Sequence, residues 1–151
     1  MLEDYYLEHI VLCLSDGLLA QCGIDLDTHR GEIAAGNLSS LRGYPFVLGS
    51  AEDIGGRIGR GLLRSSGVSP VSKATSENVE TLLALCEQGV GACFCPENLL
   101  HTALSPEQLA HLHILPLCPE ASYPICFGYL SRSYPWSVLS EFIRIAREQT
   151  A

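Results

Sequence analysis

The chain has 151 residues, of which 47% are hydrophobic and 17% charged, and its formal net charge is −8. This composition excludes a disordered chain and leaves room for a substantial core. Because binding to phosphate backbones requires clustered Lys and Arg, nine basic against seventeen acidic residues argue against nucleic-acid binding by this chain.

Hydropathy and cysteine usage limit the cellular compartments that fit this sequence. No apolar run approaches the roughly 20 residues that a membrane-spanning helix needs. The seven cysteines lie mostly inside apolar runs, and no secretory signal precedes them. We therefore expect free, buried thiols and a cytoplasmic protein without membrane association.

The first third of the chain predicts a strand, an irregular excursion and a second strand. Residues 7–14 end in an apolar run and predict a strand, with a short helical turn at 18–22 after a polar stop. Residues 24–43 show no lasting periodicity and predict a surface excursion with at most a short helix near Glu32. Residues 44–50 predict a buried strand that opens onto a helix.

The helix after Ser50 combines an apolar stripe with basic and glycine positions. The stripe has four-residue spacing: Ile54, Ile58 and Leu62. Three arginines are predicted to lie on a solvated face: Arg57, Arg60 and Arg64. Four glycines weaken the helix and predict close packing against another backbone: Gly55, Gly56, Gly59 and Gly61.

The middle of the chain repeats the strand and helix alternation. Residues 70–74 predict a weak strand, and Thr75 or Ser76 is expected to cap an amphipathic helix over 79–86. The apolar "ACFC" at 92–95 predicts a buried strand. Such alternation implies parallel strands joined by helices, and therefore an α/β sheet.

The last third predicts two strands and a closing helix. Residues 97–102 predict a short helix, 111–117 a weak strand and 123–130 a stronger one. Pro135 stands where a final amphipathic helix would begin. Its apolar stripe consists of Leu139, Phe142, Ile143 and Ala146.

Two strand ends could bind a ligand. In open α/β sheets, ligands bind beyond the carboxyl ends of the strands, where helix N-termini present free N–H groups. Ser50 follows the strand at 45–48, and the Thr75-Ser76 pair follows the strand at 70–74. Each could equally be a plain helix cap.

Metal and catalytic motifs are not supported. Cys93-x-Cys95 and His111-x-His113 lack the two to four intervening residues of standard zinc knuckles, so no metal site is predicted. The sequence holds no nucleophile elbow, P-loop or dinucleotide fingerprint, and no cofactor or catalytic residue is predicted. A nucleophile formed by a spatially adjacent Cys and His stays open as an alternative.

Taken in order, several segments resemble the effector-binding region of LysR-type transcriptional regulators. "YYLEHIVLCLSD" looks like the family's crossover strand, and "NLSSLRGYPFVL" like the approach to its "PFIL" strand. "SENVETLLALCEQGVGACFCPENLL" looks like its polar cap, helix, glycine pair and strand ending in proline. "YPICFGYLSRSYPWSVLSEFIRIARE" resembles the return strand and closing helix.

The resemblance implies a type 2 periplasmic-binding-protein fold with two lobes and no enzymatic activity. Residues 1–16 would be a crossover strand, residues 17–121 the second lobe, and residues 122–151 the return strand and C-terminal helix of the first lobe. A small-molecule effector would bind between the lobes. The effector-binding residues carried over by position are Ser50, Thr75, Ser76 and Asn78.

The sequence departs from the family in two respects, and the first has a physical consequence. The winged helix-turn-helix and most of the first lobe have no counterpart, so we expect a fragment or a truncated homologue. Glu52 and Asp53 place carboxylates at the helix start after Ser50, which makes an anionic effector less expected. Without the first-lobe sheet, the closing helix is expected either to dock on a second chain or to repack on the remaining lobe. Its residues expected at a homo-oligomer interface are Trp136, Leu139, Phe142 and Ile143.

The sequence therefore predicts a small-molecule-sensing regulatory domain of a LysR-type regulator, or a truncated homologue. Two alternatives stay open. One is an interaction module that pairs with other chains and binds no ligand, and the other is a small Cys/His enzyme.

Overall fold

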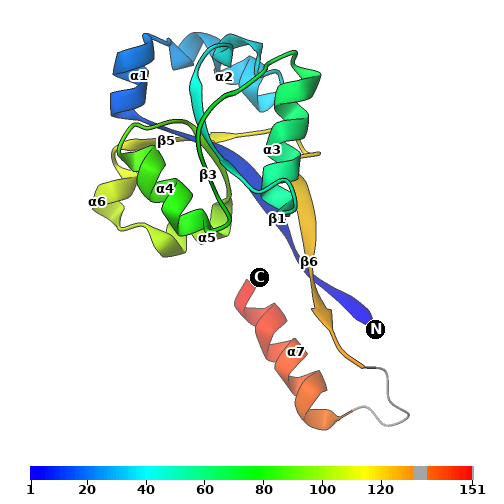
Figure 1. The fold of residues 1–151 in the computed structure, drawn as a ribbon. Coiled ribbons are helices and arrows are strands. Elements are labelled where there is room, and N and C mark those ends of the chain that lie inside the picture. Colours follow the sequence, from blue (N-terminus) through cyan, green and yellow to red (C-terminus); the bar gives the residue numbers. More distant parts are fainter. Residues whose placement is uncertain (131–135, 151) are drawn as a thin grey trace. The chain divides into compact units, whose positions relative to one another are not determined.

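A computed structural model describes residues 1–130 and 136–150 (Figure 1). Pro135, the expected start of the closing helix, lies outside the described residues. The chain divides into two compact units, one of residues 9–121 and one that joins residues 1–8 to residues 122–150. Each unit is described by itself.

The larger unit is built on two β-sheets that an isolated parallel bridge joins. Its strands are β1 (Leu2–Ser15, which begins in the smaller unit), β2 (Pro45–Gly49), β3 (Val71–Ser76), β4 (Cys93–Pro96) and β5 (Leu112–Pro116). Its helices are α1 (Asp16–Cys22), α2 (Leu26–Ala34), α3 (Ile54–Ser65), α4 (Val79–Glu87), α5 (Glu97–Ala103) and α6 (Pro106–Leu109), with a 3₁₀ turn η1 at Ser39–Leu41. The α/β class predicted from the sequence is confirmed, and α6 had not been expected.

The expectation of parallel strands is correct for only part of the sheet. β2 and β3 pair in parallel, and a parallel bridge joins Phe46 to Ala92 just before β4. β1, however, pairs antiparallel with both β4 and β5. Local alternation predicts the crossovers between consecutive strands, but it carries no information on which distant strand lies beside β1.

Helices cover both faces of this sheet. Side chains alternate along β1, so Val11 and Cys13 join the buried cluster that α4 and α5 cover with Leu83 and Leu100. Ile10 lies on the opposite face, where α3 packs. The result is a layer of helices on each side of a central sheet, as expected of an α/β fold.

Of the four α3 glycines predicted to pack against another backbone, Gly56 does so, Gly59 packs against a side chain, and Gly61 has nothing within 4 Å; Gly91, outside α3, also meets backbone. A Cβ added at Gly56 would lie 2.1 Å from the carbonyl oxygen of Ser50, and one at Gly91 would lie 2.8 Å from the backbone of Phe46. A Cβ at Gly59 would lie 2.4 Å from the ring of Phe94. The neighbour is therefore backbone at two positions and an aromatic ring at the third.

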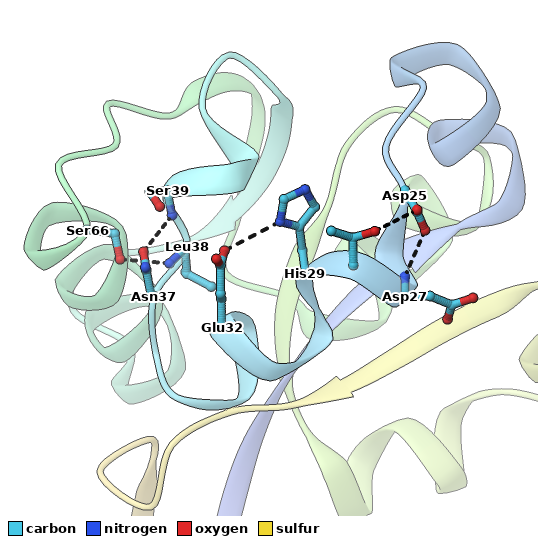
Figure 2. A network of polar contacts seen from close by, with 9 residues as sticks. Asp25, Asp27, His29, Glu32, Asn37, Leu38, Ser39 and Ser66 are labelled. Carbon is cyan, nitrogen blue, oxygen red and sulfur yellow. Dashed lines mark hydrogen bonds and ion pairs between the residues drawn. The ribbon is translucent and has the colours of Figure 1, made fainter.

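The segment 24–43, expected to be an irregular excursion, contains a nine-residue helix held by side-chain hydrogen bonds (Figure 2). Asp25 caps α2 by accepting from the Asp27 backbone N–H at 3.1 Å and from the Thr28 hydroxyl at 2.7 Å. The Leu38 N–H then donates to Ser66 Oγ at 2.9 Å. Only two of its residues, Leu26 and Ile33, are buried, so its apolar pattern is short and periodicity could not reveal it.

The core contains four contacting cysteines, in agreement with the prediction of buried free thiols. They are Cys13, Cys86, Cys93 and Cys95. The Sγ atoms of Cys13 and Cys95 are hydrogen-bonded at 3.5 Å and form no disulfide. Hydrogen bonding to Cys13 and burial raise the pKa of the Cys93 thiol, which makes it a poor nucleophile.

The smaller unit is a two-stranded ribbon with one helix. Met1 and Tyr129 exchange two backbone hydrogen bonds of 2.8 Å and 3.1 Å, the pattern of antiparallel strands, so residues 2–8 of β1 run antiparallel to β6 (Ser122–Gly128). Helix α7 (Ser137–Thr150) contacts the ribbon through Arg147, whose Nη2 donates to the carbonyl of Asp4 at 3.0 Å.

Two glycines of α3 test how tightly this helix packs. Gly59→Ala should lower the free energy of unfolding by about 1–3 kcal/mol, because its methyl group would overlap the Phe94 ring. The matched control is Gly61→Ala, which finds open space within 4 Å and should stabilise the helix by up to about 1 kcal/mol. Urea denaturation followed by circular dichroism measures both; equal effects of the two variants would contradict the packing.

Candidate functional site

The parallel pairing of β2 and β3 brings the predicted effector residues to one edge of the sheet. Leu48 is paired with Thr75 and Gly49 with Ser76, so Ser50 directly follows a residue paired with Ser76. Helices α3 and α4 begin within a few residues of these strand ends. The two hydroxyl-bearing turns expected from the sequence therefore lie side by side.

Ser50 and Ser76 occupy equivalent turns. Ser50 Oγ accepts a hydrogen bond from the Glu52 N–H at 3.2 Å, and Ser76 Oγ accepts one from the Asn78 N–H at 3.0 Å. Because each hydroxyl oxygen is the acceptor in these bonds, its hydrogen can donate to a ligand. Both residues are half-buried, whereas Thr75 and Asn78 are exposed.

The helix caps differ from those expected. The sequence suggested Thr75 or Ser76 as the cap of α4, but Asn78 caps it, since its Oδ1 accepts from the Thr81 N–H at 3.1 Å. Asp53 caps α3 in the same way, through the Gly56 N–H at 3.0 Å. The hydroxyl of Ser76 is thus not used as the helix cap. The side-chain Oδ1 of Asn78, in contrast, already accepts the Thr81 N–H.

Arg60 is a residue of this edge that the sequence placed on a solvated face. The side chain is half-buried, and its Nη2 donates to the carbonyl oxygen of Gly49 at 3.0 Å. Its Nε is buried and has no hydrogen-bond partner among the described residues. Arg57 and Arg64 are exposed, as expected. Helical spacing alone could not separate Arg60 from the other two.

The charge of this edge is mixed. Glu52 and Asp53 lie at the start of α3, and Glu80 lies in the first turn of α4. Asp53 is engaged with the helix that it caps, and Arg60 contributes a positive charge beneath the end of β2. A ligand here meets hydroxyl donors flanked by carboxylates and one guanidinium.

The four predicted interface residues differ in how far they are exposed to solvent. Trp136 and Phe142 are 61% and 59% exposed, whereas Ile143 is only 6% exposed. Leu139 is half-buried. The structure thus separates an outward pair from an inward pair on the same helix.

The two histidines of the rejected metal motif form an acid–imidazole contact instead. His113 Nε2 lies 2.6 Å from Asp16 Oδ1, and His111 Nδ1 lies 3.7 Å from Asp16 Oδ2. Within residues 1–130 and 136–150, no group of three or more His, Cys, Asp or Glu side chains is arranged to hold a metal ion. The same ranges contain no helix that is long and apolar enough to cross a membrane.

Comparison with known proteins assigns the chain to a family. Residues 4–151 match the family described as the LysR substrate binding domain. The chain belongs to this family. The match takes up nearly all of the 151 residues, so it leaves no room within them for a winged helix-turn-helix. A comparison with curated proteins found no match.

Solved structures share the fold of this LysR substrate-binding domain. The regulatory domain of CcmR from Synechocystis PCC6803, in complex with 2-PG, superposes with a TM-score of 0.70 at 11% sequence identity. The superposition covers 99% of this chain and 66% of the CcmR chain. The regulatory domain of CrgA from Neisseria meningitidis gives 0.64 at 18% identity, covering 100% of this chain and 69% of its own. The effector-binding domain of QuiR in complex with shikimate gives 0.65 at 12% identity, covering 99% and 64%.

The solved structures confirm the predicted fold, and the family match confirms the predicted class of protein. The chain spans 66% and 64% of the CcmR and QuiR domains, so about a third of each has no counterpart here. LysR regulatory domains belong to transcription regulators and are not enzymes. The small Cys/His enzyme is accordingly disfavoured, as the raised pKa of Cys93 also indicates.

The contact of His113 with Asp16 predicts a pH dependence of stability. Hydrogen bonding from His113 lowers the pKa of Asp16 in the folded state. A lowered carboxyl pKa stabilises the fold at pH values above the unfolded value of about 3.9, and this stabilisation disappears as the pH falls through the folded-state pKa. Asp16→Asn should therefore be destabilising at pH 6, and the difference from the wild type should shrink below about pH 4.

Urea denaturation between pH 3 and pH 7 measures this effect. His113→Gln should reproduce the flattened pH profile of Asp16→Asn, whereas His111→Gln should retain most of the wild-type profile because its contact is longer. Parallel profiles for the wild type and Asp16→Asn would contradict the assignment.

Proposed function

We propose that the edge formed by the ends of β2 and β3 binds a small-molecule effector. Ser50 and Ser76 supply hydroxyl donors, and Thr75 and Asn78 flank them on the exposed side. The observation that carries this proposal is the register of β2 and β3, which brings two separate hydroxyl turns and the starts of two helices to one place. Ligand binding at such strand ends is a general property of open α/β sheets.

The chemistry of the edge favours a small, oxygen-rich molecule. Hydroxyl hydrogens donate to carboxylate, phosphate or hydroxyl oxygens. Arg60 adds positive charge, while Glu52 and Asp53 oppose an effector of high negative charge. The related CcmR and QuiR domains are complexes with 2-PG and shikimate, which makes these two compounds sensible members of a first ligand panel.

The biological role follows from the family. In a transcription regulator, an effector acts by favouring one of two arrangements of the protein, and a DNA-binding portion responds to the change. These 151 residues would supply the sensing part and would not bind DNA themselves. The free thiols of all seven cysteines support a reducing cytoplasm as the compartment.

The C-terminal helix is proposed to associate with a second copy of the chain. Trp136 and Phe142 present large exposed apolar side chains, and Leu139 and Ile143 form the partly covered stripe beside them. Monomeric proteins seldom leave such contiguous apolar surface in water. An interaction module without ligand is the alternative if only this association is found.

The effector site is tested with the double variant Ser50→Ala/Ser76→Ala. For the wild type, a compound at 100 times its Kd should raise the free energy of unfolding by about 2.7 kcal/mol, or the melting temperature by roughly 5–10 °C. Loss of two hydrogen bonds should weaken binding roughly tenfold or more, measured by isothermal titration calorimetry.

Ser65→Ala is the matched control, because its hydroxyl donates to the carbonyl of Gly61 at the far end of α3. This control should bind the compound as the wild type does. Equal affinity of the double variant and the wild type would contradict the site, and a panel without any binder would favour the interaction module.

A further inference from the structure

The starts of helices α3 and α4 already contain their own hydrogen-bond acceptors. Asp53 Oδ2 accepts the Gly56 N–H at 3.0 Å, and Asn78 Oδ1 accepts the Thr81 N–H at 3.1 Å. At α3 the acceptor is a carboxylate, and a carboxylate at a helix N-terminus occupies the position that a bound anion would take. Asp53 therefore acts as a built-in anion at this edge of the site.

Close packing holds the Asp53 carboxylate at the end of β2. A Cβ added at Gly55 would lie 3.1 Å from Asp53 Oδ2, and one added at Gly49 would lie 3.6 Å from the same atom. The carboxylate oxygen thus lies beside the backbone of Gly49, the last residue of β2, and Ser50 follows Gly49 in the chain. An anionic group bound at Ser50 would lie beside this carboxylate.

Carboxylates outnumber guanidinium groups around the two turns. The turns and the helix residues that follow them carry four carboxylates and two guanidinium groups: Glu52, Asp53, Glu77, Glu80, Arg57 and Arg60. Among the described residues, none of these four carboxylates takes part in an ion pair, whereas Glu3, Asp27 and Glu141 are each paired with an arginine. The negative charge of this edge is therefore not compensated by pairing.

Two cations of this region lie away from Ser76. Arg60 Nη2 donates to the carbonyl of Gly49 at 3.0 Å. The Val47 N–H donates to the segment before β4, and Gly49 has the same parity, so its carbonyl is directed toward the β4 side of β2. Ser76 is paired with Gly49 from the other side, in β3. Lys73 precedes Ser76 by about 10 Å along β3.

The hydrogen-bonding groups of this edge suit a ligand hydroxyl group. The hydroxyl hydrogens of Ser50 and Ser76 can donate to a ligand oxygen, because their oxygens accept backbone N–H groups. The exposed carboxylates of Glu52 and Glu77 can accept from a ligand O–H. A ligand hydroxyl group both donates and accepts, whereas an ionised carboxylate only accepts and is repelled by like charges.

We propose that this site selects an uncharged, polyhydroxylated effector and that Asp53 determines this specificity. The inference rests on the proposed effector site and specifies the chemical class that it takes. Asp53 occupies the anion position of α3, and Glu52 and Glu77 repel a second anion. Hydroxyl groups, in contrast, use both the serine donors and the carboxylate acceptors.

Shikimate and its methyl ester test the inference, because they share a ring and its hydroxyl groups and differ in the ionised carboxylate. Isothermal titration calorimetry at low salt should find the ester bound roughly tenfold tighter by the wild type. Asp53→Asn removes the charge and keeps an oxygen to cap α3. It should reduce this preference roughly three- to tenfold. The preference should also shrink when NaCl is raised from about 20 mM to about 300 mM, since salt screens exposed charges.

Asp25→Asn is the matched control, because Asp25 caps α2 as Asp53 caps α3 and its loss changes the net charge equally. This variant should keep the wild-type preference. Tighter binding of shikimate than of its ester, or an unchanged preference in Asp53→Asn, would overturn the charge selection and leave the effector site standing.

The other compounds of the panel decide the case in which neither shikimate nor its ester binds. Uncharged polyols as the only binders would support the inference, and binding of a carboxylate or phosphate compound alone would overturn it. A panel without any binder would overturn the effector site itself and this inference with it.

Discussion

The proposed site depends on the parallel pairing of β2 with β3. If the register shifted by one residue, Ser50 would no longer lie beside Ser76, and the side chains of the shifted strand would exchange faces. Two close approaches fix β2 in place. Gly91 lets the chain before β4 pass against the backbone of Phe46, and Gly56 lets α3 start against the carbonyl of Ser50. The site is therefore built on backbone packing that larger residues would disrupt.

The two units contribute different properties. The larger unit has a closed core, with helices on both sides of its sheet and contacting thiols at its centre. The smaller unit is a ribbon and a helix whose apolar arc is wider than the surface beneath it. Sensing and association can accordingly be separated by mutation, because their residues lie in different units.

Apart from α6, sequence patterns predicted the strand and helix order after residue 44, because apolar runs and caps there are local signals. They could not select Asn78 over Thr75 and Ser76 as the cap of α4, since all three can cap and only the turn geometry decides. The helix within 24–43 was missed because only Leu26 and Ile33 are buried on it, which leaves too short an apolar pattern to recognise. The role of Arg60 depends on a contact with a strand end, which helical spacing does not encode.

Backbone amide NMR of the ¹⁵N-labelled chain tests the central claim most directly. Titration with shikimate, 2-PG and a panel of neutral polyols should identify a compound that shifts the amide signals of Ser50, Thr75 and Ser76 in a saturable way. Signals of α2 and α6 should stay in place, because these helices lie away from the strand ends of β2 and β3. Saturable shifts confined to other residues would contradict the proposed effector site.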